Sequence, residues 1–193
     1  EVSIHADAVG VGNGGKVVIW SDGSTRFYGS LSARGGANSG DGGKAEVSGK
    51  QNLTFAGKAD LAAPKGQTGA VLLDPDDLYV GADPTNGAVV EPDGDTDPTT
   101  FFAQTNPNDY YVLAASLAGD TAYTLQANHD VIFNASVAFG SAGANTVVVT
   151  AANNIQSTGF SVSTAGGALT LNSATMALGA LDTGAGLLTI NNS

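Results

Sequence analysis

GGKAEVSGKQNLTFAGKADLAAPKGQTGAVLLDPDD, residues 42–77, is the stretch that decides the fold, because it repeats a pattern found just before it. The run GGKAEV at 42–47 follows GGKVVI at 14–19 at an offset of 28 residues, and a third copy starts with GAVLL at 69–73. Short alternating strands around a glycine follow the first two starts. A period of this size carried by strands is typical of a solenoid.

The composition indicates a single all-β domain over residues 1–193. The chain has 27 glycines, 42% hydrophobic residues and 13% charged residues, which describes a folded, turn-rich protein rather than a disordered one. Short β-rich segments are separated by Gly, Asn, Asp and Ser over most of its length. There is no cysteine, so disulfides and thiolate metal sites are excluded.

The formal net charge of −11 is unevenly distributed. All seven Lys and Arg lie in the first 65 residues beside six acids, and the other twelve acids have no base near them in sequence. Such a chain would repel phosphate backbones, so we expect no nucleic-acid partner. No apolar run approaches the roughly 20 residues of a membrane span.

The last third repeats with a shorter period. Asn128, Asn153, Asn172 and Asn191 recur at spacings of 25, 19 and 19, each at the end of an alternating strand. Parallel stacking of coils would bring these residues to one corner, where their amides could form a structural ladder; alternatively, Asn merely tolerates the turn. Coils of about 20–25 residues would give eight or nine coils in the chain.

Residues 82–120 interrupt the pattern. Four prolines and several acids crowd into the first part, which predicts an irregular excursion rather than a regular coil. The run from Tyr110 to Gly119 is the one helix-like stretch, and Asp109 and Gly119 could cap it. We therefore expect one Pro- and Asp-rich loop and a short helix within the all-β fold.

The stretches at 14–36 and 40–80 resemble the repeat region of filamentous-haemagglutinin-type exoproteins, the large bacterial adhesins of two-partner secretion systems. LQANHDVIFNASV at 125–137 and the segment 166–193 are similar to the same family's downstream repeats. The resemblance implies a right-handed parallel β-helix. It also implies export through an outer-membrane secretion partner, a place on the bacterial cell surface, and a receptor on a host or neighbouring cell.

A candidate calcium site lies in the excursion. Asp93, Asp95 and Asp97 place oxygen ligands at alternating positions, as at the start of an EF-hand loop. The match then fails, because Pro98 replaces the required glycine and Gln104 the bidentate glutamate. A solvated acidic loop is the alternative interpretation. We expect no other cofactor.

Aromatic pairs flank the same segment. Phe101, Phe102, Tyr110 and Tyr111 could offer stacking faces to a glycan or another partner, because binding residues tend to lie on loops. Alternatively, these pairs pin the loop onto the body of the protein.

Nothing in the sequence predicts catalysis. His5 and His129 are the only histidines, and no Gly-x-Ser-x-Gly elbow supports a hydrolase triad. β-Helical lyases and glycosidases combine carboxylates with basic contacts to an acidic sugar. The carboxylates of residues 74–97 are instead far in sequence from any arginine, so we expect an acidic substrate to be repelled there.

The sequence therefore predicts a non-catalytic structural and adhesive stalk module of a secreted bacterial cell-surface protein. Both ends are in strand pattern, so we expect a segment of a longer repeat protein. Two alternatives stay open: a self-assembling extracellular fibre subunit, because unpaired strand edges invite end-to-end association, and a carbohydrate-binding or carbohydrate-degrading β-helix.

Overall fold

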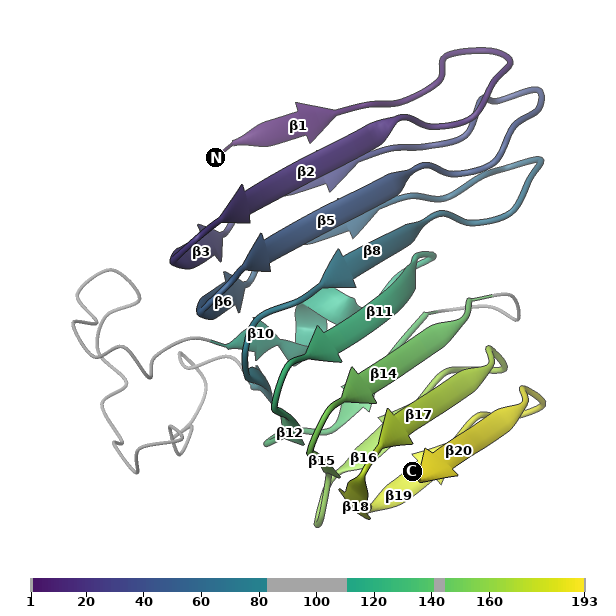
Figure 1. The fold of residues 1–193 in the computed structure, drawn as a ribbon. Helices are drawn as coiled ribbons and strands as arrows, with labels where there is room; N and C mark the ends of the chain where they lie inside the picture. Colours follow the sequence, from purple (N-terminus) through teal and green to yellow (C-terminus); the bar gives the residue numbers. More distant parts are fainter. Residues whose placement is uncertain (1, 83–110, 141–144, 193) are drawn as a thin grey trace.

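The computed structural model describes residues 2–82, 111–140 and 145–192 and is built almost entirely from β-strands (Figure 1). Every strand pairing within these residues is parallel. The strands belong to four sheets, and the chain visits the sheets in turn rather than completing one before starting the next. The prediction of an all-β protein with parallel pairing is confirmed.

Two long sheets contain seven described strands each. The first long sheet consists, in spatial order, of β2 (Lys16–Ser21), β5 (Lys44–Gly49), β8 (Ala70–Leu73), β11 (Ala122–Ala127), β14 (Val147–Ala151), β17 (Leu169–Ser173) and β20 (Leu188–Asn192). The second long sheet consists of β3 (Ser24–Phe27), β6 (Asn52–Phe55), β10 (Val112–Leu113), β9 (Leu78–Gly81), β12 (Asp130–Phe133), β15 (Asn154–Gln156) and β18 (Thr175–Ala177).

The described residues also form two short sheets and one helical turn. The first short sheet contains β1 (Ser3–His5), β4 (Ser30–Ser32) and β7 (Lys58–Asp60), and the second contains β13 (Val137–Ala138), β16 (Ser161–Ser163) and β19 (Ala180–Asp182). A 3₁₀ helix, η1 (Ala114–Leu117), contacts both β7 and β13 and so occupies the place between the two short sheets. No helix in the described part of the chain has the length and apolar character needed to cross a membrane.

The strand register follows the sequence repeat. Lys16 pairs with Lys44 and Phe27 with Phe55, so the predicted offset of 28 residues is the true register of these strands. Paired residues in the sheets formed by β1 to β8 are 26 to 28 residues apart, and the hydrogen bond between Asn13 and Asp41 also spans 28 residues. Ala70 of β8 pairs directly with Ala122 of β11, 52 residues further along the chain, so the described chain contributes seven strands to each long sheet rather than eight or nine.

The core lies between the sheets, and it forms because the strands alternate. In β14, Val149 is fully buried whereas Val148 and Thr150 are half-buried. Burial of every second side chain is what a pleated strand with one inner face requires. Like residues stack in register in this core: the rings of Phe27 and Phe55 lie parallel, with centroids 5.8 Å apart.

The prediction of a short helix over residues 110–119 is wrong. Val112 and Leu113 instead form β10, which inserts between β6 and β9 by pairing with Phe55 and Val80, and only the 3₁₀ turn η1 follows. Insertion into the sheet satisfies the backbone of this segment and buries Val112, and this tertiary gain outweighs a local preference for helix. The expected cap, Asp109, lies outside the described residues, and Gly119 adopts a φ of +117° two residues after η1.

The hydroxyl group of Thr121 closes the edge of β7 that faces η1. The Leu61 amide donates to the Thr121 Oγ1 (3.2 Å), and Oγ1 donates to the Ala59 carbonyl (3.3 Å). Thr121 is 1% exposed, so water does not replace it. The Thr121 hydroxyl satisfies the hydrogen bonding of the Leu61 amide and the Ala59 carbonyl, which a neighbouring strand would otherwise satisfy.

We expect Thr121→Val to lower the free energy of unfolding by about 1–3 kcal/mol, because it leaves a buried amide and a partly buried carbonyl without their partner. Urea denaturation measures the change. Thr124→Val is the matched control, because Thr124 faces outward on β11 and is half-exposed, and we expect it to be nearly neutral. Equal stabilities of the two variants would contradict the role given to Thr121.

Candidate functional site

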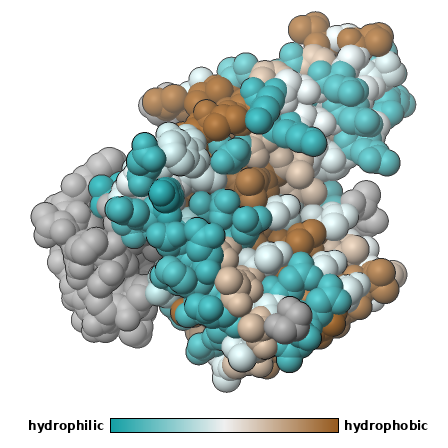
Figure 2. Space-filling model, viewed as in Figure 1, coloured by the Kyte–Doolittle hydropathy of each residue, from teal (hydrophilic) through white to brown (hydrophobic). Residues whose placement is uncertain are grey.

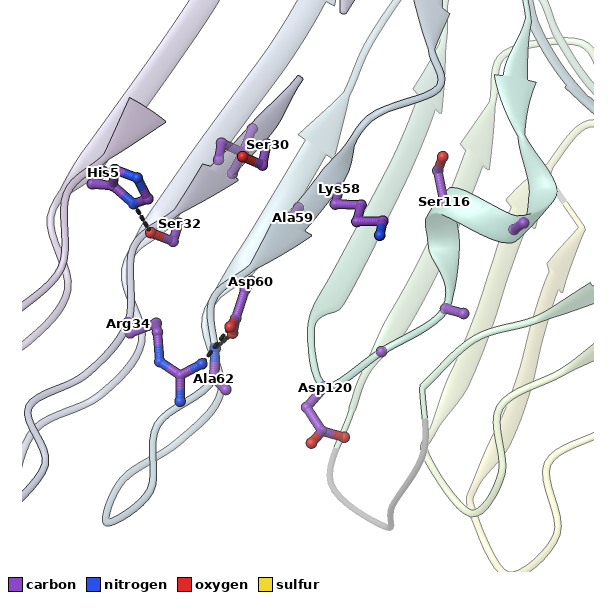
Figure 3. Close-up of a pocket in the computed structure, with 14 residues that line it drawn as sticks. His5, Ser30, Ser32, Arg34, Lys58, Ala59, Asp60, Ala62, Ser116 and Asp120 are labelled. Carbon is purple, nitrogen blue, oxygen red and sulfur yellow. Dashed lines mark hydrogen bonds and ion pairs between the residues drawn. The ribbon is translucent and has the colours of Figure 1, made fainter. Parts of the chain in front are cut away.

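A groove of about 550 Å³ lies where η1 stands in the place of a strand (Figure 3). The strands β4 and β7 form one side of the groove and the segment 115–120 the other, with His5 at the far end of the first short sheet. Pockets of this size accommodate small ligands. Several small residues, among them Ala59, Ala115 and Ala118, leave room for one.

The parallel register places two columns of polar residues on the first short sheet. Ser3, Ser30 and Lys58 form one column, and the hydroxyl groups of the two serines are 2.9 Å apart. The second column is His5, Ser32 and Asp60. Because both columns run across the strands, their last members, Lys58 and Asp60, stand at the edge of the groove.

Ser32 is hydrogen-bonded to both His5 and Asp7, but not in the manner of a catalytic triad. The Ser32 hydroxyl donates to the Asp7 Oδ2 (2.8 Å), and His5 Nδ1 lies 2.8 Å from the Ser32 Oγ. A triad needs the serine proton to go to histidine and the carboxylate to orient that histidine. Here the serine hydroxyl donates its hydrogen bond to the carboxylate and not to histidine, so the arrangement does not activate Ser32 as a nucleophile.

The charged residues of the groove are partly neutralised. Arg34 Nη1 and the Asp60 Oδ2 form an ion pair, with both side chains nearly half exposed, and the Asp60 Oδ1 also accepts a hydrogen bond from the Ala62 amide (3.1 Å). The Asp7 Oδ1 accepts a hydrogen bond from the Arg34 amide (2.7 Å). These contacts fix the positions of Arg34 and Asp60 more than they stabilise the fold, because exposed ion pairs contribute little.

Two side chains of the groove lack a partner among the described residues. Lys58 is exposed, and its ammonium group makes no ion pair or hydrogen bond; it extends from β7 toward η1 in Figure 3. Ser116 on η1 is only 8% exposed, and its hydroxyl makes no hydrogen bond. The backbone of Ser116 is fixed, because its carbonyl accepts a hydrogen bond from the buried Tyr123 hydroxyl (3.0 Å).

The four asparagines occupy two kinds of place. Asn172 and Asn191 pair in register on β17 and β20, where the Asn191 amide donates to the Asn172 Oδ1 (2.7 Å) and Asn172 donates to the Thr150 Oγ1 (3.1 Å). Asn128 lies in a turn and donates to the Asp76 Oδ1 (2.8 Å). Asn153 lies in the next turn, where its backbone amide donates to the His129 carbonyl (2.9 Å). The structure therefore joins Asn172 to Asn191 and keeps the other two apart from them.

Most of the other candidate residues lie outside the described part of the chain: Asp93, Asp95, Asp97, Phe101, Phe102 and Tyr110. Tyr111 is described, and it is 6% exposed, so its ring packs inside rather than offering a stacking face. No group of three or more His, Asp or Glu suited to a metal ion occurs among residues 2–82, 111–140 and 145–192.

An acidic turn follows β8. Burial, reinforced by the charges of Glu46 and Asp76, raises the pKa of Asp74 above its ordinary value. A raised pKa in the folded state means that the contribution of Asp74 to stability is present below the unfolded pKa of about 3.9 and is lost as the pH rises through the folded pKa. At pH 7 the ionised Asp74 therefore destabilises the fold.

We expect Asp74→Asn to raise the free energy of unfolding at pH 7 by less than about 1 kcal/mol, because solvent screens this half-buried group. The gain should disappear at pH 3, where Asp74 is protonated in both states. Thermal unfolding at the two pH values measures it, with Asp22→Asn as an exposed control. A gain that is the same at both pH values would contradict the electrostatic cause.

Comparison of the sequence with models of known protein families finds no match, and comparison with curated proteins finds no significant similarity. The groove therefore has to be interpreted from its own residues. Sequence reasoning did not select Lys58 or Ser116. The position of Lys58 could have been predicted, because the repeat offset of 28 residues aligns it with Ser30. The sequence carries no corresponding pattern for Ser116.

Proposed function

We propose that the chain is a right-handed parallel β-helix and serves as a non-catalytic structural and adhesive stalk module of a secreted bacterial cell-surface protein of the two-partner secretion type. The observation that carries the proposal is the continuous pairing of seven parallel strands in the first long sheet, in sequence order from β2 to β20. Each coil would then template the next, as in other repeat proteins whose units contact only their neighbours.

The buried core supports the proposed role as a structural stalk. Fully buried apolar residues recur from β5 to β17 on one inner column: Ala45, Val71, Tyr123, Val147 and Leu169. A core that runs the length of the stack resists bending, because every coil packs on two others. Such a module would hold a binding region away from the cell, with export through an outer-membrane partner as the sequence resemblance implies.

If the chain is a non-catalytic stalk, it should bind cells and leave polysaccharides intact. Beads coated with the purified chain should adhere to cultured cells, and the chain should release no reducing sugar or unsaturated product from a panel of plant and bacterial polysaccharides. Adhesion without turnover supports the stalk. Turnover of any of these polysaccharides excludes it in favour of a carbohydrate-degrading enzyme.

A fibre subunit is the second candidate, because the exposed large hydrophobic residues gather near the first and last strands. They are Val2, Val9, Val11, Val18, Trp20, Leu187, Leu188 and Ile190. Figure 2 shows hydrophobic residues as separate small groups on the visible face rather than one continuous patch. End-to-end association through the edge strands would cover those near the ends. Electron microscopy of the chain distinguishes the two candidates, because filaments support assembly and short single rods oppose it.

A further inference from the structure

Two side chains on the outer face of the second long sheet are buried where exposed side chains are expected. Thr54 on β6 and Tyr111, just before β10, each precede a residue whose side chain lies in the core. Because successive side chains of a strand point to opposite faces, both point outward. Thr54 is nevertheless only 1% exposed and Tyr111 only 6%. An uncovered sheet face stays in contact with water, so another layer covers these two side chains.

The cover is confined to one part of this face. Arg26, on the neighbouring strand β3, pairs with Thr54 and is exposed. In the other direction the same row continues through Tyr79 and Ile132, which are half-buried, to the exposed Gln156 on β15. The most deeply buried outward side chains of this row therefore belong to β6 and to the start of β10, where the chain enters the sheet again after leaving it at β9.

The strand order limits which segment can form this cover. β9 and β10 follow one another along the chain and are adjacent and parallel, with Val80 paired to Val112. A connection between two such strands returns from the end of one to the start of the other and needs a dozen or more residues. The positions from 83 to 110, which lie outside the described part of the chain, supply it. A route around the core is closed, because β8 pairs directly with β11 and leaves no place for a further strand between them, so the outer face is the route that stays open.

The face and the segment also suit each other chemically. Tyr79 and Tyr111 give the face aromatic surface, and Arg26 gives it a positive charge. The segment contains no Lys or Arg, and it carries several acids between Asp83 and Asp109, the adjacent valines Val89 and Val90 and the adjacent phenylalanines Phe101 and Phe102. Such a segment can bury its apolar side chains on the tyrosines and place a carboxylate near Arg26.

We propose that residues 83–110 dock on the outer face of the second long sheet, over Thr54 and Tyr111, and that this face is the contact surface for the chain's own excursion. Phe101 and Phe102 then contact the sheet and do not serve as stacking faces for a glycan. The inference goes beyond the stalk function and does not depend on it, because a solenoid of any function can carry such a segment.

The rate at which single cysteines react with iodoacetamide tests the proposal, because the chain has no cysteine of its own. Thr54→Cys and the matched control Gln156→Cys both face outward in the same row of the sheet. In the full chain we expect the cysteine at position 54 to react at least about tenfold more slowly than the one at 156, because covered thiols react only when the cover opens. Equal rates at the two positions overturn the proposal.

Two changes to the segment identify it as the cover. Replacing residues 83–110 by a Gly/Ser linker of equal length should bring the rate at position 54 to within about threefold of that at 156, with folding checked by circular dichroism. In the intact segment, Phe101→Ser combined with Phe102→Ser should raise the rate at position 54 severalfold and leave that at 156 unchanged. Protection of position 54 that persists in both variants shows that the neighbouring strands bury it, and overturns the proposal.

A cross-link measures the contact without altering the segment. Arg26→p-benzoylphenylalanine places a photoreactive group beside Thr54, at a position far in sequence from residues 83–110. Irradiation should join position 26 to a peptide from that segment, identified by mass spectrometry, and Gln156→p-benzoylphenylalanine should give no such product. A segment that cross-links equally from both positions, or from neither, contradicts docking over β6 and β10.

Discussion

Val149→Asp is expected to prevent folding, whereas Val148→Asp, one residue away on the same strand, is expected to be tolerated. Val149 is fully buried and lies in register between Leu125 and Leu171, which are also buried. A carboxylate there would lose its hydration without gaining a partner, at a cost of about 4 kcal/mol or more. That is a large part of the stability of a typical domain.

The side chain of Val148 points the other way. It pairs with Thr124 and Thr170 on the outer face and is only half-buried, so an aspartate there stays in contact with water. Circular dichroism and soluble yield at 25 °C measure both variants. If Val149→Asp folds as well as Val148→Asp, the inner and outer faces of this strand have been assigned wrongly.

Phe55→Ala is expected to lower the free energy of unfolding by about 3–5 kcal/mol. Phe55 is fully buried, stacks on Phe27 and packs in a ladder that also includes Val112 of β10. Removing the ring leaves a cavity beneath β6, because the backbone pairing of β6 with β3 and β10 prevents collapse.

Trp20→Ala is the control for this substitution, because it also deletes an aromatic ring, but from a side chain that is 52% exposed. We expect it to cost less than about 1 kcal/mol. Urea denaturation followed by circular dichroism gives both values. A cost for Trp20→Ala as large as that for Phe55→Ala would show that ring burial does not set the cost of deleting an aromatic side chain from the two long sheets.

The register of the first half could be predicted from the sequence because identical residues recur at a fixed offset. Once Gly42-Gly43-Lys44 is set over Gly14-Gly15-Lys16, the alternation of apolar residues fixes which side chains face inward. A shift by one residue would turn every one of them outward, so the pattern tolerates a single register. The phenylalanine stack follows from the same alignment.

The segment around residues 110–119 could not be predicted in the same way. Its apolar run fits a short helix as well as a strand, and no repeat partner aligns with it. Pairing within the sheet decides for a strand over a helix, because Val112 pairs with both Phe55 and Val80. Long-range pairing of this kind leaves no local signature.

The candidate site was only partly predictable for the same reason. The polar columns that end at Lys58 and Asp60 follow from the repeat offset and could have been read from it. Ser116 comes from the segment after β10, whose position depends on the insertion between β6 and β9. The groove therefore combines a repeated strand edge with an element that has no repeat.

Distances along one column of the first long sheet test the central claim most directly. Val18, Glu46, Leu72, Thr124, Val148, Thr170 and Thr189 pair in register across all seven strands. The chain has no cysteine, so spin labels on cysteines introduced in pairs report only the chosen positions. Pairing position 18 with positions 148, 170 and 189 should give separations of about 19, 24 and 29 Å, in equal steps of about 4.8 Å. Separations that fail to increase in this order, as in two facing antiparallel sheets, would contradict the account.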